Sequence, residues 1–157
     1  MREDADVRFI SLKTHQLSEA FAAYKAGLYT SIDTAFGWDE DYQTQRFHSR
    51  YAVEDLYWIV SADRRVGLLC YRLHEDALHL HLHLHLALIF REAQSQGLGS
   101  QVMAQLHRLA QETQRPITLS SFKDNHGAIR FYRRHGYRIT GEDAHFVELE
   151  RGWDQRA

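Results

Sequence analysis

The chain has 157 residues, 44% of them hydrophobic, with a formal net charge of -2 at pH 7, so it is long enough to bury the core of one domain over residues 1–157. Balanced charges without a long basic block argue against a nucleic-acid partner and favour a small molecule. The single Cys70 excludes an internal disulfide, the charged start is unlike a secretory signal, and no apolar run reaches the roughly 18–20 residues of a membrane span. We therefore expect a cytoplasmic protein without a membrane partner, and leave a homodimer open.

The first third of the chain predicts a strand followed by two helices. Residues 7–12 suit a short strand. Apolar residues then recur at helical spacing over residues 17–32, and Thr14 is placed to cap that helix. Gly37 interrupts the pattern, and the acidic residues after it are typical of the start of a second helix that runs to about Tyr51.

The remaining sequence predicts three strands and then alternating helices and strands. The apolar runs at residues 56–62, 66–73 and 78–90 indicate an antiparallel meander. The later elements are a helix at 97–113, a strand at 116–122, a helix at 126–136, and strands at 136–142 and 145–151. This order predicts an α/β (α+β) fold with a mixed, mostly antiparallel sheet and helices on both faces.

Residues 79–85 read HLHLHLH, which is an unusual strand. Alternation along a strand places the leucines on one face, and on the other His79, His81, His83 and His85. The leucine face is typical of a core. The histidine face could serve in proton transfer, bind a metal or form a polar surface. A metal is possible because histidines two apart on a strand can share a zinc ion. No cysteine or acidic cluster accompanies the run, so we expect no metal, and we interpret His79 and His81 as part of a polar face.

The segment QSQGLGS, residues 94–100, joins the histidine strand to the next helix. Gly97 and Gly99 leave room for a ligand near the backbone, and the amides and dipole of a helix start favour an anion such as a pyrophosphate. A glycine pair at such a junction is also typical of a tight turn. The segment is neither a P-loop nor a GxGxxG fingerprint.

A second motif stands about thirty residues later, in NHGAIRFYRRHGY, residues 125–137. QxxGxG followed at this spacing by NxxAxxxYxxxGY resembles the GNAT superfamily of acetyl-CoA-dependent N-acetyltransferases, over roughly residues 57–151. The resemblance implies a single GNAT acyltransferase domain that moves the acetyl group of acetyl-CoA to a primary amine. A non-catalytic acyl-CoA-binding or sensor domain is the alternative from another class.

The resemblance also implies roles for individual residues. The backbone around Ala87, Leu88 and Ile89 would pair with the pantetheine arm, which Asn125 would contact. Tyr132 would protonate the departing thiolate, although a core tyrosine of an amphipathic helix would look the same. The pyrophosphate would be held by the loop, which consists of Gln94, Ser95, Gln96, Gly97, Leu98, Gly99 and Ser100.

This chain departs from the family pattern in the loop. Gln94 and Gln96 stand where an arginine or lysine is common in the family. Nearby bases that could substitute at the phosphates are Arg91, Arg130, Arg133 and Arg134, although solvated charges on helix or loop faces need no such role.

The histidine strand bears a more local resemblance, to arylalkylamine (serotonin-type) N-acetyltransferases. Those enzymes have two histidines twelve and fourteen positions before the first glycine of QxxGxG, which correspond here to His85 and His83. Histone-type relatives have a carboxylate base at the position of His83. A histidine can take the ammonium proton of an amine near neutral pH, directly or through water.

In this family the first two helices and their connection form one wall of the acceptor pocket, which is residues 35–42 here. Phe36 and Trp38 could pack an apolar or aromatic body, and Asp39, with its acidic neighbours, could attract a cation. The acids also suit the first turn of a helix without any substrate. We expect a small amine, and a protein N-terminus, a lysine side chain, an aminoglycoside or a polyamine are alternatives.

Overall fold

The computed structural model describes residues 6–75 and 80–155, and the chain divides into two compact units. Unit 1 consists of Met1–Cys70 and Leu86–Val102, and unit 2 of Tyr71–His85 and Met103–Ala157. The single domain over residues 1–157 stays a prediction.

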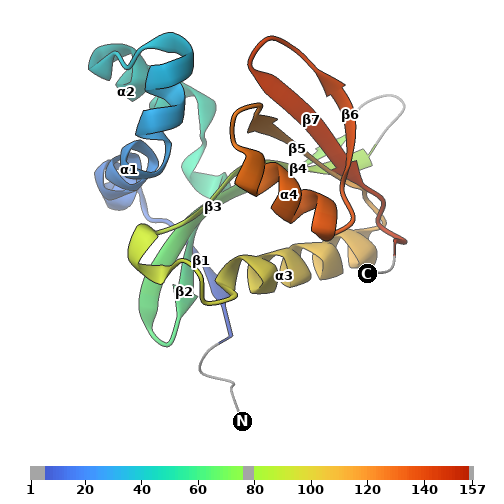
Figure 1. The fold of residues 1–157 in the computed structure, drawn as a ribbon. Coiled ribbons are helices and arrows are strands. Elements are labelled where there is room, and N and C mark those ends of the chain that lie inside the picture. The colour runs from blue at the N-terminus through green and yellow to red at the C-terminus, as the bar shows by residue number, and fades with distance from the viewer. Residues whose placement is uncertain (1–5, 76–79, 156–157) are drawn as a thin grey trace. The chain divides into compact units, whose positions relative to one another are not determined.

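The helices and strands follow the predicted order (Figure 1). They are β1 (Arg8–Ser11), α1 (Leu17–Phe36), α2 (Glu40–Arg50), β2 (Leu56–Ser61), β3 (Arg64–Glu75), β4 (Leu80–Ile89), α3 (Leu98–Thr113), β5 (Ile117–Phe122), α4 (His126–Arg134), β6 (Arg138–Glu142) and β7 (Phe146–Arg151), with short 3-10 turns at Thr14–Gln16, Val53–Asp55 and Arg91–Ala93.

Hydrogen bonds between the described residues give the strand order β1-β2-β3-β4-β5-β7-β6. The pairs β1–β2, β2–β3, β5–β7 and β6–β7 are antiparallel, and β4–β5 is parallel. The predicted mixed, mostly antiparallel sheet is therefore confirmed.

In unit 1, aromatic rings hold α1 and α2 together. The ring centroids of Tyr24 in α1 and Phe47 in α2 are 5.2 Å apart, and the Tyr24 hydroxyl donates to Gln43 Oε1 over 3.1 Å. Tyr24 and Phe47 are almost fully buried. Such ring pairs contribute stability beyond their buried area, so the two helices form one aromatic layer.

The start of α1 differs from the sequence prediction. Thr14 opens a 3-10 turn, and Gln16 precedes α1 without a side-chain cap, so the prediction that Thr14 caps the helix is wrong. The additional turn is closed by Gln16, whose Oε1 accepts from the Lys13 backbone N–H at 2.9 Å. A threonine before an apolar periodic run does not reveal such an extra turn.

Two glycines of unit 1 fix the end of β4. A Cβ atom at Gly67 of β3 would overlap the carbonyl oxygen of Leu88, and one at Gly27 of α1 would lie 3.0 Å from the Leu88 side chain. Next to this contact, Phe90 N–H donates to the Val66 carbonyl over 2.8 Å. The Leu88 carbonyl therefore requires glycine at position 67, while a Cβ at position 27 would only crowd the end of the Leu88 side chain.

In unit 2, β5 is the central strand. It pairs with β7 along Ile117–Phe122 and, in parallel, with β4 through Leu82↔Ile117, His83↔Thr118 and Leu84↔Leu119. The core side chains below 5% exposure include Leu84, Leu106, Ile117, Leu119 and Leu149. The β6–β7 hairpin follows α4 (Figure 1).

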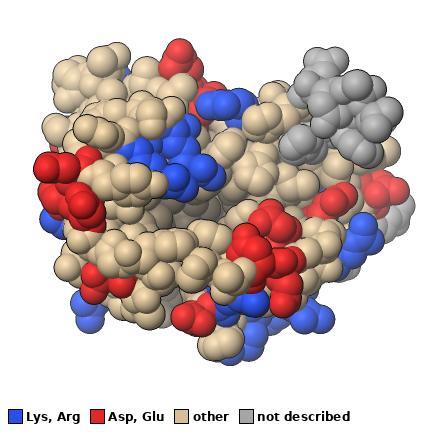
Figure 2. All heavy atoms as spheres, turned by 90° about the horizontal axis from the view of Figure 1, so that it is seen from above, with Lys and Arg blue, Asp and Glu red and all other residues tan. Residues whose placement is uncertain are grey.

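The surface charges agree with the balanced composition. On the face in Figure 2, lysines and arginines are interspersed with aspartates and glutamates. Within residues 6–75 and 80–155, no helix is both long enough and apolar enough to cross a bilayer. The cytoplasmic location and a homodimer stay predictions.

Candidate active site

The loop at residues 94–100 lies in unit 1 and turns sharply before α3. Ser95 and Gly97 have positive φ angles of 65° and 77°, while Gln96 between them does not. Such alternation turns successive backbone amides toward one side and is typical of anion-binding concavities. The loop side chains are exposed, apart from Leu98, which is 6% exposed and anchors the first turn of α3 in the core.

Gly97 is required for its backbone conformation. A Cβ atom there would meet nothing within 4 Å, so the φ of 77° selects glycine and crowding does not. Because glycine has no side chain, it cannot cap α3 from this position. The amide groups at the start of α3 and the positive end of its dipole are suited to an external anion.

Gln94 has a structural function in the loop. Its Nε2 donates to the Ile89 carbonyl at 3.0 Å, which ties the loop to the end of β4. Ala87, Leu88 and Ile89 themselves are half-buried. The predicted pantetheine segment and the predicted phosphate loop therefore form one connected piece of unit 1.

A pocket of about 390 Å³ adjoins the loop in unit 1. It is lined by Ser61, Ala62, Arg64, Val66, Gln96, Leu98 and Gln101. Arg64 is therefore a positively charged residue of the pocket that Gln96 also lines. The sequence analysis missed it, because the β2–β3 hairpin and not sequence proximity brings it there. Of the four arginines proposed from the sequence, Arg91 lies on a 3-10 turn and Arg130, Arg133 and Arg134 lie on α4.

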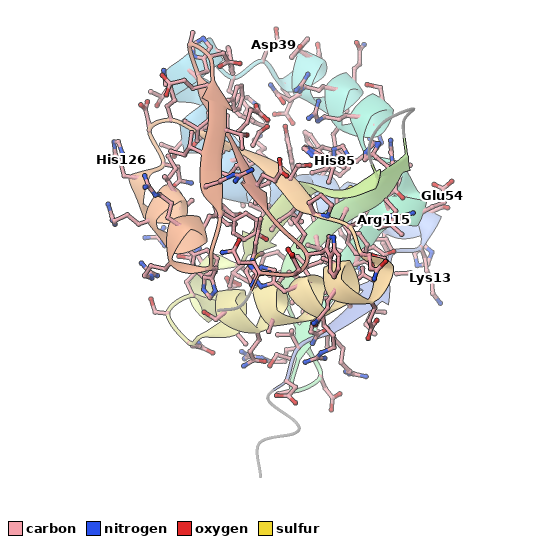
Figure 3. All side chains as sticks on the ribbon, turned by 90° about the vertical axis from the view of Figure 1, so that its right-hand side faces the viewer. Lys13, Asp39, Glu54, His85, Arg115 and His126 are labelled. Carbon is pink, nitrogen blue, oxygen red and sulfur yellow. The ribbon has the colours of Figure 1, made fainter. Side chains whose placement is uncertain are left out.

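The connection between α1 and α2 is held by its own acidic residues. Asp39, labelled in Figure 3 at the start of α2, accepts from the Tyr42 backbone N–H at 3.0 Å and caps the helix. Glu40 accepts from Lys25 Nζ at 2.8 Å and from Trp38 Nε1 at 2.9 Å, and these bonds lower its pKa. Both carboxylates thus have local partners, as expected for a helix start.

Aromatic side chains are exposed beside this connection. Phe36 is 56% exposed and Tyr29 is 42% exposed. The half-buried Trp38 has its ring centroid 5.1 Å from that of Tyr29. This part of unit 1 therefore exposes aromatic side chains to solvent beside the acidic residues of the connection.

The alternation of the histidine strand is confirmed where the structure describes it. Leu84 and Leu86 are buried, at 4% and 6% exposure, while His83 and His85 are half-buried on the other face. Figure 3 labels His85 on β4. His79 and the side chain of His81 lie outside the described residues.

Specific side chains of unit 2 hold the two described histidines. His83 Nδ1 lies 2.7 Å from Thr118 Oγ1 on β5, and His85 Nε2 lies 3.3 Å from His74 Nε2 on β3. The His83 and His85 rings meet edge to face with centroids 4.5 Å apart. In the part of the chain that the structure describes, no group of three or more His, Cys, Asp or Glu is arranged to hold a metal ion.

Helix α4 of unit 2 carries the second motif. Asn125 caps the helix, because its Oδ1 accepts from Ala128 N–H at 3.1 Å. Tyr132 packs against Tyr137, with ring centroids 5.5 Å apart. Burial raises the pKa of Tyr132 to about 12, so its phenol keeps its proton at neutral pH.

A match to a family of acyltransferases agrees with this fold and with the loop between β4 and α3. The family model described as "Acetyltransferase (GNAT) family" matches residues 17–137, and the chain belongs to this family. None of the curated proteins compared matches the chain.

Solved structures show the same fold at low sequence identity. An acetyltransferase from Thermus thermophilus has a TM-score of 0.73 at 14% identity, covering 94% of this chain and 97% of that one. The PaiA N-acetyltransferase of Thermoplasma acidophilum, solved with coenzyme A, has a TM-score of 0.71 at 11% identity, covering 93% and 98%. The ribosomal-protein-S18-alanine N-acetyltransferase of Escherichia coli has a TM-score of 0.66 at 15% identity, covering 96% of each chain.

Proposed function

We propose that the chain transfers the acetyl group of acetyl-CoA to a primary amine, and that the amine is a small molecule. Family membership carries the transferase part of this proposal. Acetyl-CoA as co-substrate is supported by the similar PaiA enzyme, whose structure contains coenzyme A. The roles of individual residues follow from their chemistry in each unit.

Binding of the coenzyme is assigned to unit 1. Backbone amides of Ser95 to Ser100 hold the pyrophosphate, a role supported by the positive φ angles of the loop and by the start of α3. The backbone of Ala87, Leu88 and Ile89 pairs with the pantetheine arm, and the close packing of Gly67 against the Leu88 carbonyl, with the Phe90–Val66 backbone bond, supports a defined backbone position there.

Chemistry at the acetyl group is assigned to unit 2. The neutral amine nitrogen attacks the thioester carbonyl carbon, the C–S bond breaks, and Tyr132 donates its phenolic proton to the thiolate. A pKa of about 12 keeps the phenol protonated until that step, and a buried thiolate is also a stronger base than one in water. Asn125, which caps the helix of Tyr132, contacts the pantetheine arm.

The amine must lose its ammonium proton before it attacks. His83 and His85 take this proton, directly or through water, because imidazole has an ordinary pKa near 6.5 and is mostly neutral at pH 7. The contact with Thr118 orients the His83 ring, and a general base must be oriented toward the proton that it accepts.

The acceptor assignment depends on the aromatic surface at the α1–α2 connection. Phe36 and Trp38 contact the apolar or aromatic body of the amine, and the exposure of Phe36 supports this role. Asp39 adds negative charge near the ammonium group, although its oxygen already caps α2.

A protein N-terminus is the second candidate acceptor. One structural neighbour that covers nearly the whole chain is an enzyme named for the alanine of a ribosomal protein. At 15% identity this likeness shows the fold alone, so the acceptor class must be measured.

Two assays on the full chain test the proposal. Calorimetric titration with acetyl-CoA should show binding, and no binding at millimolar ligand would remove the enzymatic function. A thiol-release assay should then compare arylalkylamines, polyamines, aminoglycosides and short peptides. We expect the fastest release with an arylalkylamine. Faster release with peptides would support the protein acceptor, and binding without any acceptor-dependent release would identify a sensor domain.

A further inference from the structure

Three histidines meet in unit 2, and the third comes from another strand. His74 of β3 has its Nε2 3.3 Å from His85 Nε2, and the two ring centroids are 5.6 Å apart. The His74 ring is also 6.1 Å from the His83 ring. All three side chains are half-buried. Neither motif includes His74, so the proposed function leaves it without a role.

The contact between His74 and His85 restricts where the protons are. A hydrogen bond between two ring nitrogens needs one donor and one acceptor, so one of the two Nε2 atoms carries a hydrogen and the other does not. If His85 Nε2 is the acceptor, neutral His85 carries its hydrogen on Nδ1, and that atom cannot take another. If His85 Nε2 is the donor, Nδ1 has the lone pair of a base.

We propose that His74 is a positioning residue for the base: its Nε2 accepts the hydrogen of His85 Nε2 and holds His85 in the tautomer whose Nδ1 takes the ammonium proton. This inference rests on the proposed function. In the step, the N–H bond of the ammonium breaks and the Nδ1–H bond of His85 forms. The Nε2 hydrogen stays in the bond to His74, which stabilises the imidazolium as an acceptor does in other base–orienter pairs.

Among the described residues, the His85 ring contacts the imidazole of His74 from β3 and that of His83 from β4 itself. From β5 the neutral hydroxyl of Thr118 joins the cluster through its contact with His83. A second imidazole is therefore within hydrogen-bond reach of His85 Nε2 and has the chemistry to orient the ring.

The tautomer can be measured without any turnover. In protein labelled with ¹⁵N-histidine, long-range ¹⁵N–¹H correlations assign the protonated nitrogen of each ring. We expect neutral His85 to carry its hydrogen on Nε2 near pH 8. In His74→Phe, which keeps a ring but has no acceptor, we expect a mixture of the Nε2–H and Nδ1–H tautomers. His74→Gln, which keeps a side-chain acceptor, should retain the Nε2–H tautomer. Wild-type His85 with its hydrogen on Nδ1 would overturn the inference.

The pH dependence of kcat is a second measurement, and it would not change if His74 had only a structural role. With the best amine, His74→Phe should lower kcat at least tenfold near pH 7 and shift the rising limb of the pH profile to lower pH, because the imidazolium loses its acceptor. His74→Gln should recover most of both. His15→Phe, at an exposed histidine of the first 3-10 turn, is the matched control and should leave both unchanged.

Two further results would contradict the role of His74. An unshifted limb in soluble, folded His74→Phe would overturn the inference, and so would one zinc ion per chain that depends on His74 in elemental analysis. If His74→Phe fails to fold, the wild-type tautomer and the His74→Gln profile still decide. If the tautomer is as expected but no amine supports turnover, the proposed function fails separately.

Discussion

The loop at residues 94–100 in unit 1 and the histidine–tyrosine residues of unit 2 are built in opposite ways. The loop exposes its side chains and depends on backbone conformation at Ser95 and Gly97. In unit 2, the candidate residues are held by contacts between side chains: His85 contacts His74, His83 contacts Thr118, and Tyr132 packs on Tyr137.

This difference indicates how each region tolerates change. Backbone amides bind an anion whatever the neighbouring side chains are, so the loop should tolerate most substitutions except those that change φ. Proton transfer needs particular groups at particular atoms, so substitutions in unit 2 should affect turnover more than affinity. Substitutions in each unit test this contrast.

The largest effect is expected at His85. His85→Ala should lower turnover about 100-fold near pH 7, the lower end of what a general base contributes, and less at high pH where the amine is already neutral. The comparison variants are His79→Ala and His81→Ala in the same run, which should do little. Steady-state thiol release across pH measures all of these variants. Equal, small effects of all of them and of His83→Ala, without bound metal, would show that the histidines form only a polar surface of the strand.

Tyr132→Phe should reduce turnover at least tenfold, about 1.4 kcal/mol in barrier height. Acetyl-CoA affinity by calorimetry should remain nearly the same, because only the transition state loses a proton donor. An unchanged turnover number, with chemistry shown to be rate-limiting, would reduce Tyr132 to a packing residue.

A pair of glycines separates ligand binding from backbone strain. Gly97 and Gly37 have φ angles of 77° and 78°, and a Cβ at either would meet nothing within 4 Å. Gly97→Ala and Gly37→Ala should therefore each cost about 1 kcal/mol of unfolding free energy. Only Gly97→Ala should also weaken acetyl-CoA binding, by a few-fold. Equal affinities of the two variants for acetyl-CoA would show that the loop does not bind the coenzyme.

The smallest effect concerns the stability of unit 2 and leaves chemistry aside. Burial, followed by the nearby charge of Arg151, lowers the pKa of His107 to about 4, and its Nε2 lies 3.0 Å from the Tyr137 hydroxyl. Because the unfolded state binds the proton more tightly, stability is fully present above about pH 6.5 and falls as the pH drops toward 4.

Thermal unfolding between these pH values tests this. The loss should be on the order of 1 kcal/mol, less than the full shift implies because His107 is only partly buried. His107→Gln should flatten the dependence. A wild-type melting temperature independent of pH in this range would show that His107 titrates normally.

The sequence predicted most elements because their patterns are local. The HLHLHLH run determines its own faces, and buried Leu84 and Leu86 confirm them. Asp39 was predictable as a residue of a helix start from the acidic residues after Gly37. The Thr14 prediction failed because a 3-10 turn and a capped α-helix begin with similar residues.

The residues that the sequence missed all depend on contacts between strands. His74 faces His85 only because of how β3 and β4 come together, and Arg64 reaches the loop pocket through the β2–β3 hairpin. Gly67 looks like any glycine in an apolar run until the Leu88 carbonyl is seen beside it. A hairpin of uncertain register does not specify such pairs.

The proposed reaction transfers the acetyl group of acetyl-CoA to an amine. Mass spectrometry can follow this transfer when the full chain reacts with the best amine from the panel and with acetyl-CoA that carries ¹³C in its acetyl group. We expect one labelled amide for each free CoA thiol formed. Thiol release without labelled amide, which means hydrolysis, or neither product at saturating acetyl-CoA, would contradict it.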